Sequence, residues 1–172
     1  MSGNNNTALP SKILRVIGYD AHIDKARISR YNYAINVFEG EEVLSAITET
    51  IRGLYAAFAK GDIPTVLGAL APDVKWTEAE GGPFGGVYIG PAAVLENVFM
   101  KIGAEWEGYA AVPGEFIAND DTVAVIGTYS AKFKATGKSF EAPFVHLWKL
   151  SGGKVVSFQQ FTDTVVHTRP MK

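Results

Sequence analysis

The sequence contains no cysteine, which excludes disulfide bonds, zinc–thiolate sites, iron–sulfur clusters and a cysteine nucleophile. It also lacks an apolar run approaching the roughly 20 residues that span a bilayer. No stretch is densely basic and the formal net charge is −2, so binding to a nucleic acid backbone has little electrostatic support. The N-terminal segment lacks the charged-then-apolar pattern of a secretory signal. We therefore expect a cytoplasmic protein that binds neither membrane nor nucleic acid.

Several catalytic motifs are missing as well. The three histidines, His22, His146 and His167, lack the paired spacing of metal ligands, so we expect no metal and no cofactor. No G-x-S-x-G segment is present to supply a serine nucleophile. The glycine-rich stretch 81–86 does not match the phosphate-binding loop pattern. What remains is an ordinary globular composition, with 47% hydrophobic and 20% charged residues.

The chain changes character near residue 40. Residues 1–40 form a polar tail and an extension of unknown role. Its second part, Lys12–Gly40, has no clean period, which leaves short strands, a helix, or an arm that reaches a partner chain as alternatives. Residues 41–168 carry the regular patterns of one folded domain.

Helices are predicted first and strands last. Apolar residues at three- and four-residue steps predict a helix over Glu41–Lys60, followed by helices over Ile63–Leu70 and Pro91–Gly103. Alternation predicts strands over Val74–Glu78, Tyr109–Ala118, Thr122–Lys134, Ser139–Leu150 and Val155–Thr164. The glycine-rich segment Glu80–Gly90 is predicted to be a connection, and Gly81–Gly86 within it a flexible rim that gates the cavity. This order indicates an α+β fold with helices on one face of a curved, mostly antiparallel sheet.

The alternation also predicts which side chains point inward. In Ser139–Leu150 the more aromatic face contains Phe144, His146 and Trp148. In Thr122–Lys134 the inward set includes Tyr129 and Gly127, whose missing side chain could leave room beside a ligand. The last strand is open to two interpretations, because a bulge near its end would exchange the faces that carry Gln160 and Asp163.

Three segments carry a family resemblance. Tyr55–Asp62 (YAAFAKGD), Leu70–Trp76 (LAPDVKW) and Phe140–Trp148 (FEAPFVHLW) resemble the SnoaL-like branch of the nuclear transport factor 2-like (NTF2-like) superfamily. The resemblance extends over about residues 41–166. It implies a cone of three N-terminal helices on a strongly curved sheet, with a ligand pocket inside and a homodimer formed through the sheet's outer face. Relatives include polyketide cyclases, ketosteroid isomerase and binding modules without catalysis.

The resemblance also implies roles for particular residues. Glu78 stands where ketosteroid isomerase has its general-base aspartate, and His146 matches a pocket histidine of the cyclases. Gln160 replaces the acid–base aspartate of the cyclases, and an amide can orient a substrate but cannot exchange a proton near neutral pH. Asp163 could take over that role if the strand bulges. Leu54 replaces the isomerase's oxyanion-binding tyrosine, with Tyr55 beside it on the helix.

Two functions remain open after these observations. The first is a cofactor-independent enzyme that isomerises, cyclises, hydrates or dehydrates a small apolar or aromatic metabolite, with His146, Asp163 and Glu78 as catalytic groups. The substrate-binding set is then predicted to be Gln160, Tyr55, Trp76, Phe84, Tyr88, Phe99, Tyr129, Phe144, Trp148 and Phe161. The second is a non-catalytic module that binds a small ligand or a protein. Both need a hollow interior. Convergence of His146 with a carboxylate within hydrogen-bond reach inside it would favour the enzyme, and an apolar cavity with no ionisable group would favour binding.

Overall fold

A computed structural model describes the backbone of residues 25–172 and the side chains of residues 40–172. The chain divides between Glu39 and Gly40 into two units, each of which is described by itself. Helix α2 (Lys25–Ala59) begins well before the predicted start at Glu41. A helix was one of the alternatives for Lys12–Gly40; residues 1–24, including His22, lie outside the described part of the chain.

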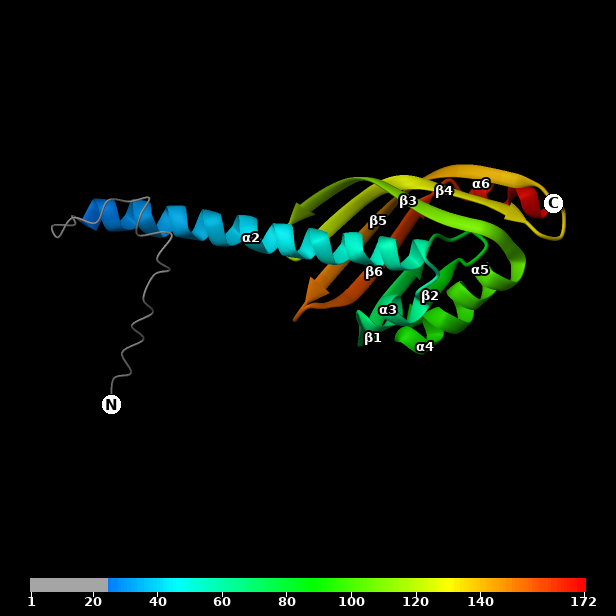
Figure 1. Ribbon diagram of the computed structural model, residues 1–172, viewed down its shortest axis with the longest axis horizontal. Helices are drawn as coiled ribbons and strands as arrows, with labels where there is room; N and C mark the ends of the chain where they lie inside the picture. Colours follow the sequence, from blue (N-terminus) through cyan, green and yellow to red (C-terminus); the bar gives the residue numbers. More distant parts are fainter. Residues whose placement is uncertain (1–24) are drawn as a thin grey trace. The chain divides into compact units, whose positions relative to one another are not determined.

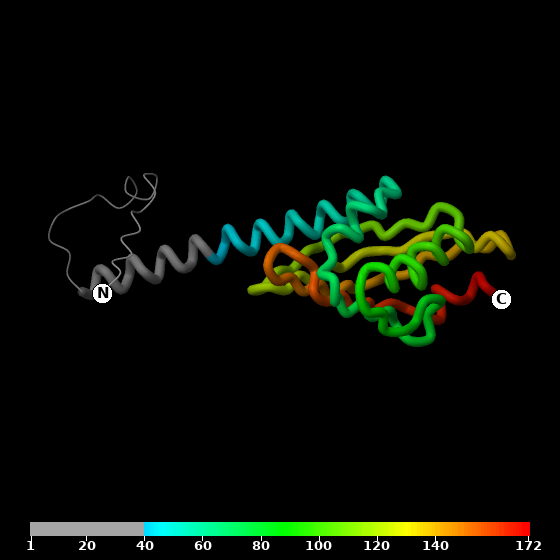
Figure 2. Tube along the Cα trace, turned by 90° about the horizontal axis from the view of Figure 1, so that it is seen from below, coloured from blue at the N-terminus to red at the C-terminus, as the bar shows by residue number. Residues whose placement is uncertain are grey.

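Within the second unit, α2 buries one face against the sheet. Figure 2 shows its last turns running beside the long strands. The side chains that enter the core from this face are those of Ile51, Leu54 and Tyr55. They follow the three- and four-residue steps that the sequence analysis identified, because such residues share one helix face. The packing of this face therefore brings Tyr55 into the interior.

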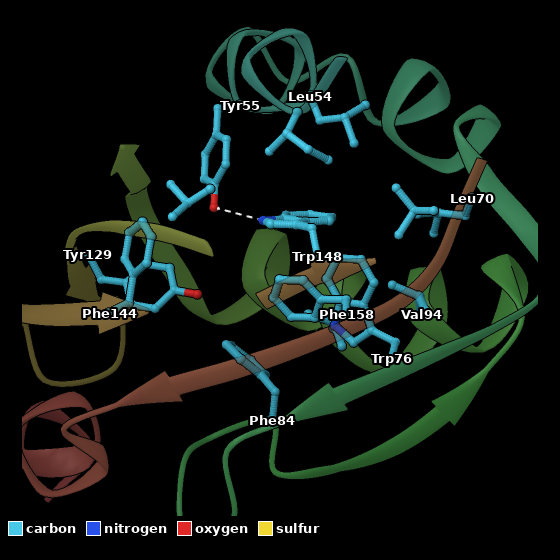
Figure 3. Close-up of a cluster of buried hydrophobic side chains, with 14 of the residues drawn as sticks. Leu54, Tyr55, Leu70, Trp76, Phe84, Val94, Tyr129, Phe144, Trp148 and Phe158 are labelled. Atoms are coloured by element: carbon cyan, nitrogen blue, oxygen red, sulfur yellow. Dashed lines mark hydrogen bonds between the residues drawn. The ribbon is translucent and has the colours of Figure 1, made fainter. Parts of the chain in front are cut away.

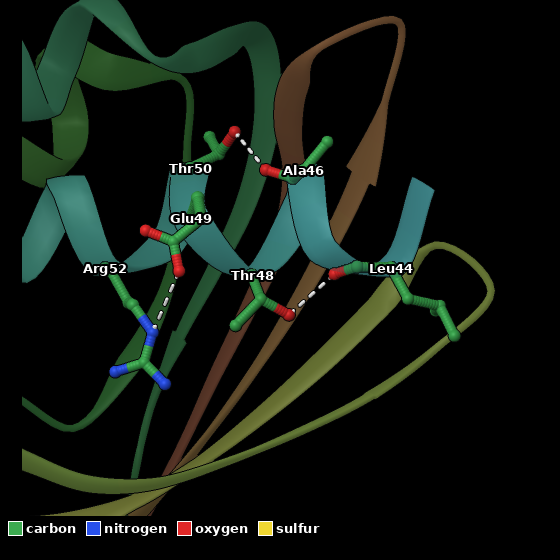
Figure 4. A network of polar contacts seen from close by, with 6 residues as sticks. All are labelled: Leu44, Ala46, Thr48, Glu49, Thr50 and Arg52. Atoms are coloured by element: carbon green, nitrogen blue, oxygen red, sulfur yellow. Dashed lines mark hydrogen bonds and ion pairs between the residues drawn. The ribbon is translucent and has the colours of Figure 1, made fainter. Parts of the chain in front are cut away.

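The face of α2 beside the buried one carries polar contacts (Figure 4). Arg52 lies 3.2 Å from the Glu49 carboxylate, one turn earlier on the helix. The hydroxyl of Thr48 donates to the carbonyl of Leu44 at 2.7 Å. The Arg52 guanidinium also lies 3.9 Å from the centre of the Phe116 ring, so this face contacts the sheet at its border.

Glycine and aspartate separate α2 from the next helix, as predicted. Gly61 has a φ of 71°, a conformation that favours glycine after a helix end. Asp62 then caps helix α3 (Ile63–Gly68) by accepting a 3.1 Å hydrogen bond from the backbone N–H of Thr65.

The third predicted helix is present but contains an irregular turn. It consists of α4 (Pro91–Val94), a π-helical segment η1 (Leu95–Phe99) and α5 (Met100–Glu105). A π-helical turn within an α-helix is often found at a functional site. Here the turn carries Val98 and Phe99, both of which face the interior cavity described below.

Six strands form one curved sheet in the order β2-β1-β6-β5-β4-β3 (Figure 1). β1 and β6 are parallel, and the other neighbouring pairs are antiparallel. The strands are β1 (Leu70–Glu78), β2 (Gly86–Ile89), β3 (Trp106–Asn119), β4 (Thr122–Phe133), β5 (Ser139–Ser151) and β6 (Lys154–Thr162). This arrangement confirms the predicted α+β class with a curved, mostly antiparallel sheet.

Two segments differ in kind from the predicted elements, while β1 and β3 begin four and three residues earlier than predicted. Part of the presumed connection Glu80–Gly90 forms the short edge strand β2, which pairs with β1. At the other end of the domain, β6 stops at Thr162, and the chain continues as α6 (Thr164–Thr168) and a 3₁₀ turn η2 (Arg169–Met171). Short, glycine-flanked strands and single helical turns carry too few residues to show a period.

The inward faces of β4 and β5 agree with the prediction, since Tyr129, Phe144, His146 and Trp148 are all buried. The expectation for Gly127 was wrong. A Cβ atom at this position would overlap the Phe144 ring and the carbonyl oxygen of Val112. The space above Gly127 is thus filled by Phe144 and is not open to a ligand.

Candidate active site

A cavity lies between the helices and the inner face of the sheet. Leu54, Phe58 and Val98 line it from the helices, and aromatic side chains from the strands line the rest. Its polar groups come from Tyr55, Glu78, Tyr109, Tyr129, His146, Trp148 and Gln160. Figure 3 shows Tyr55 pointing from α2 toward Trp148 on the sheet, with Trp76 and Phe158 beside it. Few polar groups in an apolar enclosure are typical of a small-molecule site.

The cavity is small. Its volume is about 60 Å³, whereas a drug-sized ligand occupies a pocket of roughly 300–1,000 Å³. A guest larger than this cavity therefore requires side chains to move, and the partly exposed residues Phe58, Phe99 and Ile102 are the lining groups at its border with solvent. The hollow interior that the sequence predicted is present in this reduced form.

Glu78 is the ionisable carboxylate of this cavity. It is the last residue of β1, points inward on the same face as Trp76, and is only 4% exposed. Trp76 Nε1 donates a 2.6 Å hydrogen bond to Oε1, while Oε2 is buried without a hydrogen-bond partner among the described residues. Burial raises the pKa of Glu78 from its ordinary 4.5 to about 7, despite the opposing effect of the Trp76 hydrogen bond. A carboxyl group that titrates near neutral pH can accept or donate a proton under physiological conditions.

His146 lies in the middle of β5 between two tyrosines. Its Nδ1 is 2.6 Å from the Tyr55 hydroxyl, and its Nε2 forms a short hydrogen bond with the Tyr129 hydroxyl. Burial lowers the pKa of His146 to about 3, so the imidazole is neutral near pH 7. A neutral ring with both nitrogens engaged holds the two hydroxyls in place and is a poor proton donor. Both ring nitrogens of His146 are therefore already paired with hydroxyl groups in this geometry, and its catalytic role stays a prediction.

Gln160 joins the same group of side chains from β6. Its Oε1 accepts a 3.2 Å hydrogen bond from the Ala79 backbone N–H, and its Nε2 donates to the Tyr129 hydroxyl at 2.9 Å. The register shift that affects β6 lies near its start, opposite Lys149, and not near its end. The alternation is therefore unbroken at Gln160, which settles its orientation toward the interior.

Asp163, the third predicted catalytic residue, lies outside the cavity. It follows β6 as the N-cap of α6 and accepts a 2.9 Å hydrogen bond from the backbone N–H of Val166. An aspartate in this position stabilises the first turn of a helix. The structure therefore brings His146 and Glu78 to one cavity, without a hydrogen bond between them, and places Asp163 elsewhere.

The predicted substrate-binding residues divide in the same way. Gln160, Tyr55, Trp76, Phe84, Phe99, Tyr129 and Trp148 line the cavity. Phe144 is buried behind it and stacks on His146 with ring centres 4.0 Å apart. Tyr88 lies on the edge strand and donates to the carbonyl of Phe84 at 2.8 Å, and Phe161 is 48% exposed on the outer face of the sheet.

Sequence reasoning missed Tyr109 and its partner His167. Tyr109 lies on β3 and lines the cavity, and its hydroxyl is 3.1 Å from His167 Nε2. His167 is fully buried on α6, stacks on Phe140, and leaves Nδ1 without a hydrogen-bond partner. Burial lowers the pKa of His167 to about 4. An aromatic residue that opens an alternating strand was the available signal for Tyr109; nothing in the sequence marked the turn that carries His167.

Two kinds of feature are absent from the part of the chain that the structure describes. Among the side chains of residues 40–172, no three His, Asp or Glu residues are grouped as a metal site would require. Within residues 25–172, no helix combines the length and apolar character needed to cross a membrane.

Comparison with known proteins agrees with this geometry. The SnoaL-like domain family matches residues 51–158, more than half of the chain. An NTF2-like protein from Burkholderia thailandensis is 36% identical, with a TM-score of 0.70, over 72% of this chain and 95% of its own. An NTF2-like protein of unknown function from Burkholderia pseudomallei is 32% identical, with a TM-score of 0.68, over 73% and 96%. TerC, co-crystallised with polyporic acid, is 31% identical, with a TM-score of 0.66, over 72% and 96%. No protein of curated function matches the sequence.

Proposed function

Because the chain belongs to the SnoaL-like domain family, we propose that it is a cofactor-independent enzyme in which Glu78 transfers a proton on a small, mostly apolar organic substrate. The observation that carries the proposal is the free Oε2 atom of Glu78, buried and unpaired in a residue that lines the apolar cavity. A buried carboxylate oxygen without a partner is costly for folding alone, and a substrate C–H or O–H group would give it one. Isomerisation, cyclisation, hydration and dehydration all include a proton transfer of this kind.

The chemistry follows from the states of the surrounding groups. With a pKa of about 7, Glu78 is ionised in a substantial fraction of molecules at neutral pH and can accept a proton. The tyrosines on the other strands keep their protons, because burial raises the pKa of both Tyr109 and Tyr129 well above the ordinary value. A protonated hydroxyl that is not already donating to a histidine can donate to a substrate oxygen. The relative TerC, co-crystallised with polyporic acid, supports an organic guest for a chain of this family.

Hydrogen exchange in D₂O tests this function without knowledge of the natural substrate. Small enolisable ketones are incubated with the wild-type protein and with Glu78→Gln, and the loss of α-C–H signal is followed by NMR. We expect exchange in the wild type to exceed that in Glu78→Gln by about 10²–10⁴-fold for the ketones that enter the cavity. Asp163→Asn, which alters a carboxylate outside the cavity, serves as the control and should keep the wild-type rate. Equal exchange in wild type and Glu78→Gln across the ketones would reject the proposal.

The alternative is a binding module without catalysis. It is favoured by one observation, namely that His146 is neutral and engaged at both ring nitrogens. Under this alternative a ligand co-purifies with the protein and is detected by native mass spectrometry, while no C–H exchange depends on Glu78.

We propose in addition that the protein forms a homodimer through the outer face of its sheet. Ile126, Val145 and Phe161 are register neighbours on β4, β5 and β6, and their exposed fractions are 40%, 37% and 48%. Leu147, 38% exposed, continues this apolar stripe along β5. Large apolar side chains in a contiguous row mark an interaction surface, and a second copy of the chain would present a matching row.

A further inference from the structure

A chain of hydrogen bonds crosses the wall of the cavity from β6 to β5. It connects Gln160, Tyr129, His146, Tyr55 and Trp148 in that order. The two tyrosines and His146 occupy its centre, and all five side chains line the cavity. The number of protons in this chain determines what it can offer to a ligand.

The direction of the hydrogen bond is fixed at each end. The indole N–H of Trp148 can only donate, and it lies 3.2 Å from the Tyr55 hydroxyl oxygen. At the other end, the Ala79 backbone N–H requires Oε1 of Gln160 as its acceptor. The amide Nε2 of Gln160 must then face Tyr129 and donate to it at 2.9 Å. Each tyrosine oxygen therefore accepts one hydrogen bond from a residue other than His146. Tyr55 accepts from Trp148, and Tyr129 accepts from Gln160.

The centre of this series of hydrogen bonds contains one proton more than its two bonds require. A neutral imidazole carries one N–H, and each tyrosine carries one O–H, which makes three protons for the two bonds that flank His146. The neighbours at either end are donors, so they cannot accept the third proton. Among the described residues no other acceptor lies within hydrogen-bond distance of either hydroxyl. One tyrosine O–H is consequently left without a protein acceptor.

We propose that this surplus hydroxyl donates to an acceptor oxygen of the ligand, so that the cavity selects small, mostly apolar molecules with a carbonyl or similar oxygen. Gln160 acts as a positioning residue. Because its Nε2 group is a donor, the Tyr129 hydroxyl cannot donate its own hydrogen bond to Gln160. The unpaired Oε2 of Glu78 lines the same cavity and supplies the complementary acceptor. The inference rests on the proposed function only in that this cavity holds the ligand.

The tautomer of His146 decides which tyrosine presents the surplus proton. With the proton on Nε2, His146 donates to Tyr129, Tyr55 donates to Nδ1, and the Tyr129 hydroxyl is left over. With the proton on Nδ1 the arrangement is reversed, and the Tyr55 hydroxyl is left over. The two arrangements present the surplus proton from different hydroxyls, so a ligand oxygen that lies nearer to one of these hydroxyls selects the corresponding tautomer.

Replacing Gln160 by glutamate removes the surplus. An ionised carboxylate at this position would accept from both Ala79 and Tyr129, and His146 would then donate from Nε2 to Tyr129 and accept at Nδ1 from Tyr55. Three protons would serve three bonds, with none left for a ligand. Gln160→Met is the matched control, because a thioether is at most a weak acceptor and leaves the count unchanged.

The test is ¹⁵N NMR of the His146 ring nitrogens in the full-length protein, recorded at alkaline pH so that a buried carboxylate is ionised. The probe is acetone, the smallest ketone, compared with isobutene, a hydrocarbon of the same shape. We expect acetone to shift the His146 tautomer signals in the wild type and in Gln160→Met, and isobutene to leave them unchanged. Gln160→Glu should show only the Nε2–H tautomer and no response to acetone.

An equal response to acetone and isobutene in the wild type would overturn the inference, and this comparison needs no variant to fold. An acetone response in Gln160→Glu, or a single unchanging tautomer in the wild type, would also overturn it. The readout does not depend on turnover. Ketone-selective shifts without Glu78-dependent exchange would leave this inference standing and reject the proposed enzyme, and the opposite result would do the reverse.

Discussion

The indole Nε1 of Trp76 donates a 2.6 Å hydrogen bond to Oε1 of Glu78, two residues further along β1, and Oε2 of the same carboxylate has no partner in the part of the chain that the structure describes. The two side chains share the inner face of the strand because their positions differ by two residues. One oxygen is thus held in place, and the other is free. This half-satisfied carboxylate is the feature from which the proposed chemistry follows.

Replacing Glu78 with glutamine should stabilise the protein increasingly as the pH rises. Burial raises the pKa of Glu78 from 4.5 to about 7, so the folded state holds this proton more tightly than the unfolded chain does. The resulting stability is present below about pH 4.5 and is lost as the pH rises through about 7. Urea unfolding at about pH 5 and about pH 8 should show the advantage of Glu78→Gln growing by about 3 kcal/mol.

Glu80→Gln is the control for this comparison, because Glu80 lies two residues away with an exposed side chain. Its difference in free energy of unfolding from the wild type should be the same at both pH values. A difference for Glu78→Gln that does not change with pH would mean that Glu78 titrates as an ordinary exposed carboxylate.

Replacing His167 with phenylalanine should make the protein less sensitive to acid. Burial lowers the pKa of His167 from 6.5 to about 4, so its contribution to stability is present above about pH 6.5 and is lost as the pH falls through about 4. Phenylalanine does not titrate, so the variant avoids this loss of about 3 kcal/mol in the free energy of unfolding. His146 continues to destabilise the folded state in acid in both proteins. At neutral pH the variant should lose about 1–3 kcal/mol, because the Tyr109 hydroxyl loses its partner. Urea unfolding at about pH 7 and about pH 4 measures both effects, and an unchanged acid sensitivity would contradict the prediction.

Replacing Asp163 with alanine should affect stability and leave chemistry intact. Its carboxylate accepts from the Val166 backbone N–H at the start of α6, and loss of such a cap costs about 1 kcal/mol. Thermal unfolding should detect this loss in Asp163→Ala but not in Asp163→Asn, since asparagine is an equally good cap. A large loss of ketone C–H exchange in folded Asp163→Asn would show that this carboxylate takes part in catalysis after all.

A lysine in place of Val145 should disrupt the proposed dimer. Val145 lies between Ile126 and Phe161 in the register of the sheet, so two copies that meet on this face would each bury a charge without a partner. Light scattering at micromolar concentration should give a dimer for the wild type and a monomer for Val145→Lys. Lys101→Glu, on α5 and away from the sheet's outer face, is the charge-change control. A monomeric wild type would reject the dimer itself.

The sequence predicted the elements in which a periodic pattern of apolar side chains continues over many residues. The strands that carry Tyr129 and His146 alternate for more than ten residues, so their inward faces could be assigned from the alternation alone. The edge strand Gly86–Ile89 and the turn that holds His167 are too short to show such a pattern.

The hydrogen bonds between side chains of the site could not be predicted from the sequence, for a different reason. Glu78 and His146 were identified singly, but the hydrogen bond from Trp76 and the pairing of Tyr55 with His146 depend on how side chains of different elements meet. Their distances depend on the curvature of the sheet and on the depth at which α2 packs. The cavity volume depends on the same quantities, which explains why the sequence indicated an enclosed space without its size.

The most direct test of the account is the titration of the Glu78 carboxyl group, followed by ¹³C NMR in the folded wild-type protein. We expect a midpoint at about pH 7, and a higher midpoint in Trp76→Phe, because that variant removes the hydrogen bond that favours the ionised form. A wild-type midpoint near 4.5, the ordinary value for glutamate, would contradict the central claim that a buried, half-paired carboxylate is available for proton transfer in the cavity.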